Sequence, residues 1–333
     1  LDDAVKGQKA ESLVAETHHG FAKNLLSQLT ADGWPPVGYE GALYSYKADT
    51  GLWICQSTEA LAKMAAESFD GLDNCKRSND YRNIAEHAIS LATDDTFFTD
   101  APIGLATPDG FICLDGIEVK TEPLTAAHRQ RVKIDVTPTS MDTTLFYTFL
   151  RETFQSKTPD EEAQQERLLQ EIFGATMLGV FYRFQKSVLF YDPFGRAGKG
   201  TVERLLRQLV PSNHVSAVSP FNWDNEYYLA TLAGARLNVV GELPEQKALP
   251  TAAYKSVIGG DLLSGRHPTY RPFTFKNEAA HLFMSNHMIN TRDHSEAYYA
   301  RWLLIKFPNS RLRSGLPIDP SLADRIIEKE LPG

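Results

Sequence analysis

The chain has little cysteine, no long apolar run and no excess of basic residues. Its 333 residues include three cysteines, which lie far apart and form no C-x2-C pair: Cys55, Cys75 and Cys113. So few thiols argue against a disulfide-stapled secreted scaffold, and we expect a cytoplasmic protein. No apolar segment reaches the roughly 20 residues that a membrane helix needs, so we expect no membrane partner.

The net charge of −8 excludes a surface coated in basic residues. It leaves room for a nucleic-acid binder whose basic groups line one channel. A hydrophobic content of 42% suffices for a sizeable core, and the length predicts two domains or three. Since the chain starts at Leu1 and stops straight after the helix-like stretch ADRIIEKEL, we expect a piece of a longer protein.

The stretch Val188–Leu206 has the order that a phosphate-binding loop requires. A short apolar run typical of a buried parallel strand comes first, then a glycine-containing turn, a lysine and an amphipathic helix. Glycines let backbone N–H groups point at an anion, the helix start adds positive potential, and the lysine supplies a point charge. The predicted nucleotide-binding residues are Gly195, Arg196, Ala197, Gly198, Lys199, Gly200 and Thr201.

The match to the pattern G-x-x-x-x-G-K-[ST] is imperfect. Pro193 occupies the first glycine position, Gly200 occupies the hydroxyl position, and Thr201 comes one residue late. One helical residue is a rotation of about 100°, so Thr201 reaches a Mg²⁺ ion only if the end of the loop is unwound. The alternative for this stretch is an ordinary strand-to-helix turn with a solvated lysine.

Three later apolar runs carry a polar residue at one end. Glu242 follows a buried-strand run, in the position where a carboxylate holds Mg²⁺ or polarises the attacking water. Asn286 ends another run, where an amide can bond the γ-phosphate or orient water. Arg301 precedes the last run, where it either pairs structurally or reaches a neighbouring subunit's nucleotide. The alternatives are a solvated glutamate, a turn-starting asparagine and a structural ion pair.

The segment from Leu263 to Phe275 reads as a protruding hairpin around Pro268. It gathers cationic and aromatic groups near its tip, which suit a phosphate backbone and base stacking. The predicted DNA-binding residues are Arg266, His267, Tyr270 and Arg271. A merely solvated hairpin is the alternative.

We predict an α/β fold with a domain boundary near residue 155. Thr158-Pro159 followed by three acids is a strong helix start at that point. Residues 1–155 are expected to form a mostly helical α+β domain, a collar or a docking domain, and residues 156–333 a phosphate-loop ATPase around a central parallel sheet.

The order of these motifs resembles the C-terminal helicase half of phage and plasmid primase-helicases, members of the superfamily-three AAA+ helicases. The resemblance covers about residues 95–333 and rests on GKGT, the strand ending in Glu242, IGGD, the basic hairpin with FTF, FMSN and EAYYARWLLIKF. It implies that Lys199 binds the outer phosphates and that Glu242 is the Walker B acid. It further implies that Asn286 is the sensor asparagine of the ATPase and that Arg301 contacts the ATP of the neighbouring subunit. The hairpin would line a channel that grips DNA.

The resemblance implies a DNA helicase that hydrolyses ATP with Mg²⁺ as a ring, expected to be a hexamer, on single-stranded or forked DNA. Thr201 and Glu242 are the expected metal ligands, and any primase domain would lie upstream of Leu1. One alternative is an ATP-binding assembly switch or loader at a replication origin, with weak or no hydrolysis. Another is a non-nucleotide scaffold with a degenerate loop.

Overall fold

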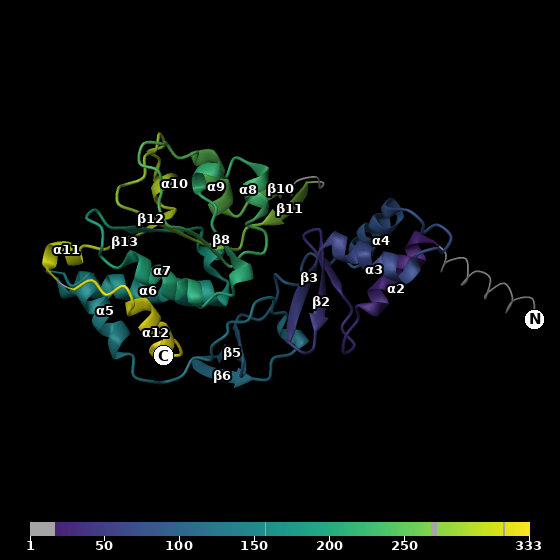
Figure 1. Ribbon diagram of the computed structural model, residues 1–333, viewed down its shortest axis with the longest axis horizontal. Helices are drawn as coiled ribbons and strands as arrows, with labels where there is room; N and C mark the ends of the chain where they lie inside the picture. The colour runs from purple at the N-terminus through teal and green to yellow at the C-terminus, as the bar shows by residue number, and fades with distance from the viewer. Residues whose placement is uncertain (1–16, 157, 268–271, 316) are drawn as a thin grey trace, which may run out of the picture. The chain divides into compact units, whose positions relative to one another are not determined.

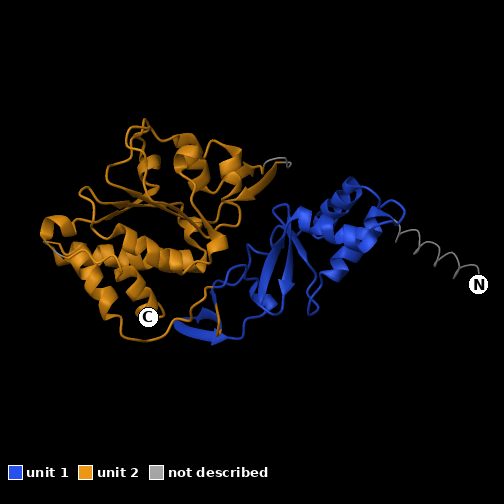
Figure 2. Ribbon diagram, in the orientation of Figure 1, with its two compact units in different colours: residues 1–106, 110–133 blue, residues 107–109, 134–333 orange. Residues whose placement is uncertain are grey.

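The computed structural model describes residues 17–156, 158–267, 272–315 and 317–333. The chain divides into two compact units, which are 1–106 with 110–133, and 107–109 with 134–333 (Figure 2). No helix within these described ranges is long and apolar enough to span a bilayer. Each unit is taken separately below.

The described part of unit 1 combines three helices with two small three-stranded sheets (Figure 1). Its core lies where the helices pack on one another, around Leu25, Leu61 and Ile84. Strands β2 and β3 form an antiparallel hairpin, and Gly51 in its turn takes a φ of 73°. The elements are α2 His18–Gln28, β1 Val37–Tyr39, β2 Ala42–Lys47, β3 Leu52–Gln56, α3 Thr58–Phe69, α4 Ser78–Leu91, β4 Leu105–Thr107, β5 Gly110–Asp115, β6 Glu118–Glu122 and η1 Ala126–His128.

Unit 2 is built on a five-stranded parallel sheet in the order β13-β7-β12-β9-β8, which confirms the predicted parallel sheet. Its strands are β7 Ser187–Tyr191, β8 Val215–Ser216, β9 Leu237–Val240, β12 Ala280–Ser285 and β13 Trp302–Lys306. A separate hairpin consists of β10 Leu262–Gly265 and β11 Phe273–Lys276. The helices are α5 Thr144–Phe154, α6 Pro159–Leu178, α7 Lys199–Gln208, α8 Glu226–Ala230, α9 Thr251–Gly259, α10 Glu296–Tyr299, α11 Arg311–Ser314 and α12 Leu322–Glu330, with 3-10 turns η2 Phe181–Phe184, η3 Ser212–His214 and η4 Pro220–Asn222.

Helices cover both faces of this sheet (Figure 1). Along β7, Val188 and Phe190 pack into one core with α5, α6, α7 and α12, whereas Leu189 packs into the other with α9 and α10. A strand buried on both faces needs apolar side chains at every position, which explains the continuous apolar runs in the sequence. The layers bring the carboxyl ends of β7, β12 and β9 side by side.

The expected domain boundary near residue 155 is displaced to residues 133–134. Helix α5 belongs to unit 2 because Glu330, at the end of α12, caps its start. The carboxylate of Glu330 accepts from the N–H groups of Leu145 (2.9 Å) and Phe146 (2.8 Å). Two helix N–H groups that lack intrahelical partners are thereby satisfied by a chain segment far away in sequence, which no local pattern reveals.

Candidate nucleotide-binding site

The loop between β7 and α7 is organised around the buried carboxylate of Asp192. Its Oδ1 accepts from the N–H groups of Phe194 (3.1 Å) and Gly195 (2.7 Å), and its Oδ2 accepts from that of Ala197 (3.1 Å). These three bonds hold the loop as a turn around its own buried carboxylate, so the N–H groups point inward. Our sequence reasoning missed this role, although Asp before Pro is a recognised turn signal.

Three residues of the loop take left-handed backbone conformations: Gly195 (φ 73°), Arg196 (φ 61°) and Gly198 (φ 99°). At Gly198 a side chain is excluded, since a Cβ there would lie 2.8 Å from Cε2 of Phe149 in α5. Close packing against α5 therefore fixes the turn into α7. The two predicted glycines shape the loop as expected, and Arg196 does so without glycine's freedom.

Lys199 is the first residue of α7 and reaches the tip of β12. Its Nζ donates to the carbonyl oxygen of Ser285 (2.9 Å) and to Oδ1 of Asn286 (2.5 Å). Burial lowers the pKa of Lys199, while the charges of Asp192 and Glu242 act in the opposite direction. The structure thus brings Lys199 and Asn286 into contact, with Glu242 close enough to influence the lysine.

Glu242 lies two residues beyond the end of β9 and is exposed to solvent. The strand order places β12 between β7 and β9, so Glu242, Asn286 and Lys199 share the carboxyl edge of the sheet. Ligands of open parallel sheets bind outside this edge.

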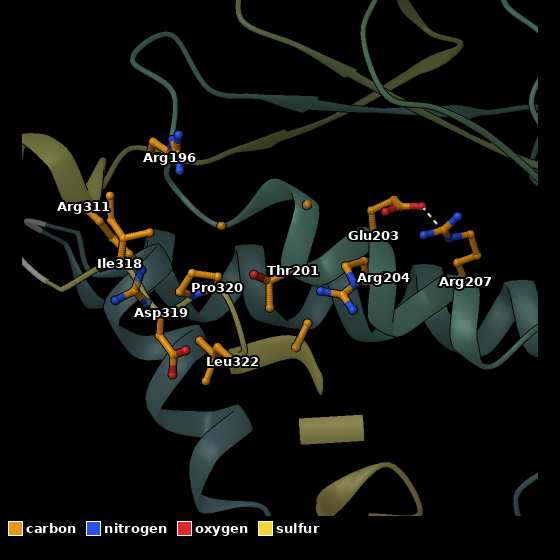
Figure 3. A pocket seen from close by; sticks show the side chains of 13 residues that line it. Arg196, Thr201, Glu203, Arg204, Arg207, Arg311, Ile318, Asp319, Pro320 and Leu322 are labelled. Atoms are coloured by element: carbon orange, nitrogen blue, oxygen red, sulfur yellow. Dashed lines mark ion pairs between the residues drawn. The ribbon is translucent and has the colours of Figure 1, made fainter. Parts of the chain in front are cut away.

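Thr201 points to the other side of α7 from Lys199. It lines a pocket of about 400 Å³ between the start of α7 and the segment that leads into α12 (Figure 3). Two helical residues amount to a rotation of about 200°, which accounts for the separation. That Thr201 and Glu242 together hold a metal therefore stays a prediction. Within the described ranges, no group of three His, Cys, Asp or Glu side chains gathers as a metal site.

For a Mg²⁺–nucleotide the carboxyl edge offers one exposed carboxylate, that of Glu242, near Lys199. The inward N–H groups of the loop are bonded to Asp192. Mg²⁺ is typically held by one or two carboxylates together with water and the substrate's phosphates. The residues present fit that arrangement without a dedicated protein cage.

Arg301 lies at the opposite, amino edge of the sheet. It directly precedes β13, whose Trp302 pairs with Ser187 at the start of β7. Its Nη1 donates to the carbonyl oxygen of Ala297 (2.6 Å), and its Nε is buried without a hydrogen-bond partner among the described residues. Five strand residues, or about 16 Å, separate this edge from the loop. Within one chain Arg301 and Lys199 are therefore not brought together.

The hairpin predicted to bind DNA is present as β10 and β11, but Tyr270 and Arg271 lie outside the described residues. Arg266 is held by α8: it approaches Glu226 at 3.6 Å and lies 5.8 Å from the ring centre of Tyr227. His267 stacks on Phe273 at 5.4 Å. The two described members of the predicted set thus pack against their own unit, and their contact with DNA stays a prediction.

Comparison with known proteins gives a family model and a fold. A model described as "Family of unknown function (DUF5906)" matches residues 193–301, which include the loop, Glu242, Asn286 and Arg301. No curated protein matches the chain.

Two apo structures of the NrS-1 C-terminal region resemble it, one with a TM-score of 0.53 at 14% identity and one with 0.51 at 13%. Each match covers 94% of this chain and 67% of the other. A JCV helicase with a bound acetamide compound gives a TM-score of 0.34 at 14% identity, over 56% of this chain and 51% of that one, a likeness too low to bear on the fold. The chain therefore shares its mixed α/β fold, with the five-stranded parallel sheet, with the NrS-1 region.

Proposed function

We propose that unit 2 is the motor of an ATP-driven, ring-forming DNA helicase of the superfamily-three AAA+ type. The observation that carries this proposal is the contact of Lys199 with Asn286 beside the loop around Asp192, at the carboxyl edge of a parallel sheet. Lysine, loop and strand-tip amide are the parts that phosphoryl-transfer enzymes use to position and stabilise the transferring group. The resemblance of the motif order to superfamily-three helicases agrees with this function.

Each group would have a defined task. Lys199 would exchange Ser285 and Asn286 for the β- and γ-phosphate oxygens of ATP, which frees the Asn286 amide to orient the attacking water. Glu242 would accept a hydrogen bond from that water and supply the protein ligand for Mg²⁺. When bound, Mg²⁺ neutralises charge on the phosphates.

The position of Arg301 supports a ring. An arginine at the amino edge cannot serve the loop of its own chain, but it can serve the loop of a neighbouring copy, as arginine fingers do. Single-stranded or forked DNA would be the track, contacted by the hairpin β10–β11, and a hexamer is the expected assembly. A primase domain upstream and a host-cell cytoplasmic setting complete the proposal.

The test is ATP hydrolysis with and without single-stranded DNA, for the chain and for Lys199→Ala. Loss of the lysine removes transition-state charge stabilisation and should lower the turnover rate by about 10²–10³-fold. Lys329→Ala, at an exposed position on α12, is the matched control. DNA-independent turnover that Lys199→Ala leaves intact would refute the motor.

An ATP-binding assembly switch or loader is the second candidate. It is favoured by the loop's departures at Pro193 and Gly200 and by the single acid at Glu242. This candidate predicts ATP binding and ATP-dependent assembly without turnover. Sedimentation with and without ATP, alongside the hydrolysis assay, separates it from the motor.

A further inference from the structure

Strands β5 and β6 of unit 1 form a hairpin whose tip exposes apolar side chains (Figure 1). Its turn consists of Gly116, which takes a φ of 66°, and Ile117. The side chains of Leu114, Ile117 and Val119 are 70%, 98% and 71% exposed. Large apolar side chains that are exposed together, rather than singly, indicate a surface that binds a partner.

Strand β6 is the outer strand of its sheet, whose order in the described part of the chain is β4-β5-β6. Residues along a strand direct their N–H and C=O groups alternately to its two sides. Asp115 and Glu118 flank the two-residue turn, and such a closing pair exchanges hydrogen bonds within the hairpin. The next residue, Val119, therefore directs its backbone groups outward. An outer strand of this kind can pair with a strand of another chain.

The two faces of the hairpin differ in chemistry. The register places Leu114 opposite Val119 on one face and Asp115 opposite Glu118 on the other. Like charges directly opposite each other destabilise a sheet. Both carboxylates are exposed, and neither forms an ion pair with any of the described residues. The hairpin thus carries an uncompensated pair of acids beside its apolar tip.

Charge and symmetry indicate which partner fits this edge. DNA and anionic lipid are disfavoured, because the tip is acidic. A second copy of β6 is complementary if the two strands pair antiparallel about a two-fold axis at Val119. Glu118 of each copy then lies opposite Lys120 of the other, since these residues flank Val119 symmetrically.

The same register also fits the backbone and the apolar face. Val119 lies opposite its own counterpart, so its outward N–H and C=O groups bond across the axis. Leu114 and Val119 of both copies then form one apolar row across four strands. A register centred on Lys120 would instead place the two lysines opposite each other.

We propose that β6 pairs antiparallel with β6 of a second copy of the chain, which joins the β4-β5-β6 sheets of the two copies into one six-stranded sheet. This contact is two-fold and is completed by two copies, whereas a ring needs head-to-tail contacts that repeat from copy to copy. The inference goes beyond the proposed function and does not depend on it, because it involves neither residues of unit 2 nor a nucleotide.

Charge reversal tests the pairing by sedimentation equilibrium of the full chain, without nucleotide or DNA. Glu118→Lys and Lys120→Glu each place like charges opposite one another twice, so each should weaken self-association at least about tenfold. Within one copy, Glu118→Lys replaces a like-charge pair with Asp115 by an opposite pair, so it does not weaken the hairpin itself. Glu328→Lys, at an exposed position of α12, is the matched control and should leave self-association unchanged.

Restoring the charge pattern tests the register. The double variant Glu118→Lys/Lys120→Glu should associate as strongly as the native chain. An equimolar mixture of the two single variants should form mixed pairs, since each variant supplies the charge that the other lacks. Both results require residues 118 and 120 of two copies to lie opposite each other.

Two kinds of result would overturn the pairing. One is a native chain that stays monomeric up to its highest soluble concentration, or single variants that associate as the native chain does. The other is a double variant, or a mixture, that stays as weak as the single variants. Self-association that Glu118→Lys leaves intact and Arg301→Ala removes would belong to unit 2, so it would overturn this pairing and support the proposed ring.

Discussion

The two edges of the parallel sheet in unit 2 differ in chemistry. At the carboxyl edge, Lys199, Asn286 and Glu242 are charged or polar groups at least partly open to solvent. Near the amino edge, Asn238 and His281 are buried and neutral, and Asn238 Nδ2 donates to His281 Nδ1 at 3.2 Å. One edge is arranged to meet a ligand, and the other is arranged to hold the strands in register.

Arg301 lies at the amino edge directly before β13, as Lys186 and Arg236 lie directly before β7 and β9. A buried guanidinium nitrogen without a partner is costly, and such groups in a native fold call for an explanation. That nitrogen is out of reach of a second copy, but the side chain as a whole is partly exposed, where the proposed ring would place a neighbour's phosphate loop. The contrast between the edges therefore bears directly on assembly.

The largest expected effect comes from removing Arg301. Arg301→Ala should lower ATP turnover by about 10³-fold or more and leave ATP affinity nearly unchanged, because the arginine acts on a neighbour's nucleotide. Turnover and equilibrium binding are measured separately. Arg167→Ala, which removes an exposed arginine of α6, is the control.

Mixing two variants tests whether Arg301 acts on the nucleotide of a neighbouring subunit. Lys199→Ala and Arg301→Ala should each be inactive, and an equimolar mixture should recover part of the turnover, since some interfaces then pair an intact loop with an intact arginine. A mixture that stays inactive, although both variants assemble, would show that Arg301 has only a structural role.

The sequence predicted the carboxyl edge far better than the amino edge. Lysine, glutamate and asparagine follow apolar strands that are readable as continuous runs, and parallel strands necessarily bring their carboxyl ends together. That reasoning placed Lys199, Asn286 and Glu242 at one edge, where the structure has them. Whether they bind and hydrolyse ATP stays a prediction.

Features that depend on contacts distant in sequence could not be predicted. The cap that Glu330 places on α5 moved the domain boundary, and the ion pair with Glu226 turned Arg266 back onto α8. The pocket wall around Ile318 likewise carries no motif. Each of these depends on which helix packs against which, and a local pattern does not contain that information.

A matched pair of glycines tests how rigid the carboxyl edge must be. Gly198→Ala forces a side chain into a φ of 99° and against Phe149, so it should cost about 2–4 kcal/mol of stability and impair nucleotide binding. Gly200→Ala meets no neighbour in a helix and should stabilise by up to about 1 kcal/mol. Urea unfolding compares the two variants. Equal stabilities of the two variants would show that Phe149 of α5 can move to make room and that packing against α5 does not fix the loop.

Near the amino edge, His281 should affect how the stability of the fold depends on pH. Burial lowers the pKa of His281 to about 3, against 6.5 for an ordinary histidine. Below pH 6.5 the unfolded chain therefore binds a proton on this histidine that the folded chain does not bind. This stability contribution is complete above pH 6.5 and is lost as the pH falls toward 3, at about 1.4 kcal/mol per unit. His281→Gln should thus lose about 2 kcal/mol less than the native chain between pH 6.5 and 5. His294→Gln, at an exposed position, is the control, and parallel curves for native chain and His281→Gln would contradict the assignment.

The smallest effect should come from the hydroxyl pair at the start of β7. Ser187 Oγ and Tyr254 Oη lie 2.7 Å apart in the core, and Tyr254 also donates to the carbonyl oxygen of Arg301 at 3.3 Å. Tyr254→Phe keeps the ring and removes both of these hydrogen bonds, but Ser187 Oγ can still donate to the carbonyl oxygen of Arg301 at 3.4 Å. Stability should therefore fall by about 1 kcal/mol. Tyr147→Phe, on an exposed tyrosine, should have no effect.

ATP affinity should be unchanged in both variants, because the altered hydrogen bonds lie at the edge away from Lys199. However, turnover by Tyr254→Phe should fall if this bond helps to hold Arg301 for a neighbouring subunit. A drop in ATP affinity instead would mean that the two edges are coupled within one chain, which would weaken the case for a site shared between copies.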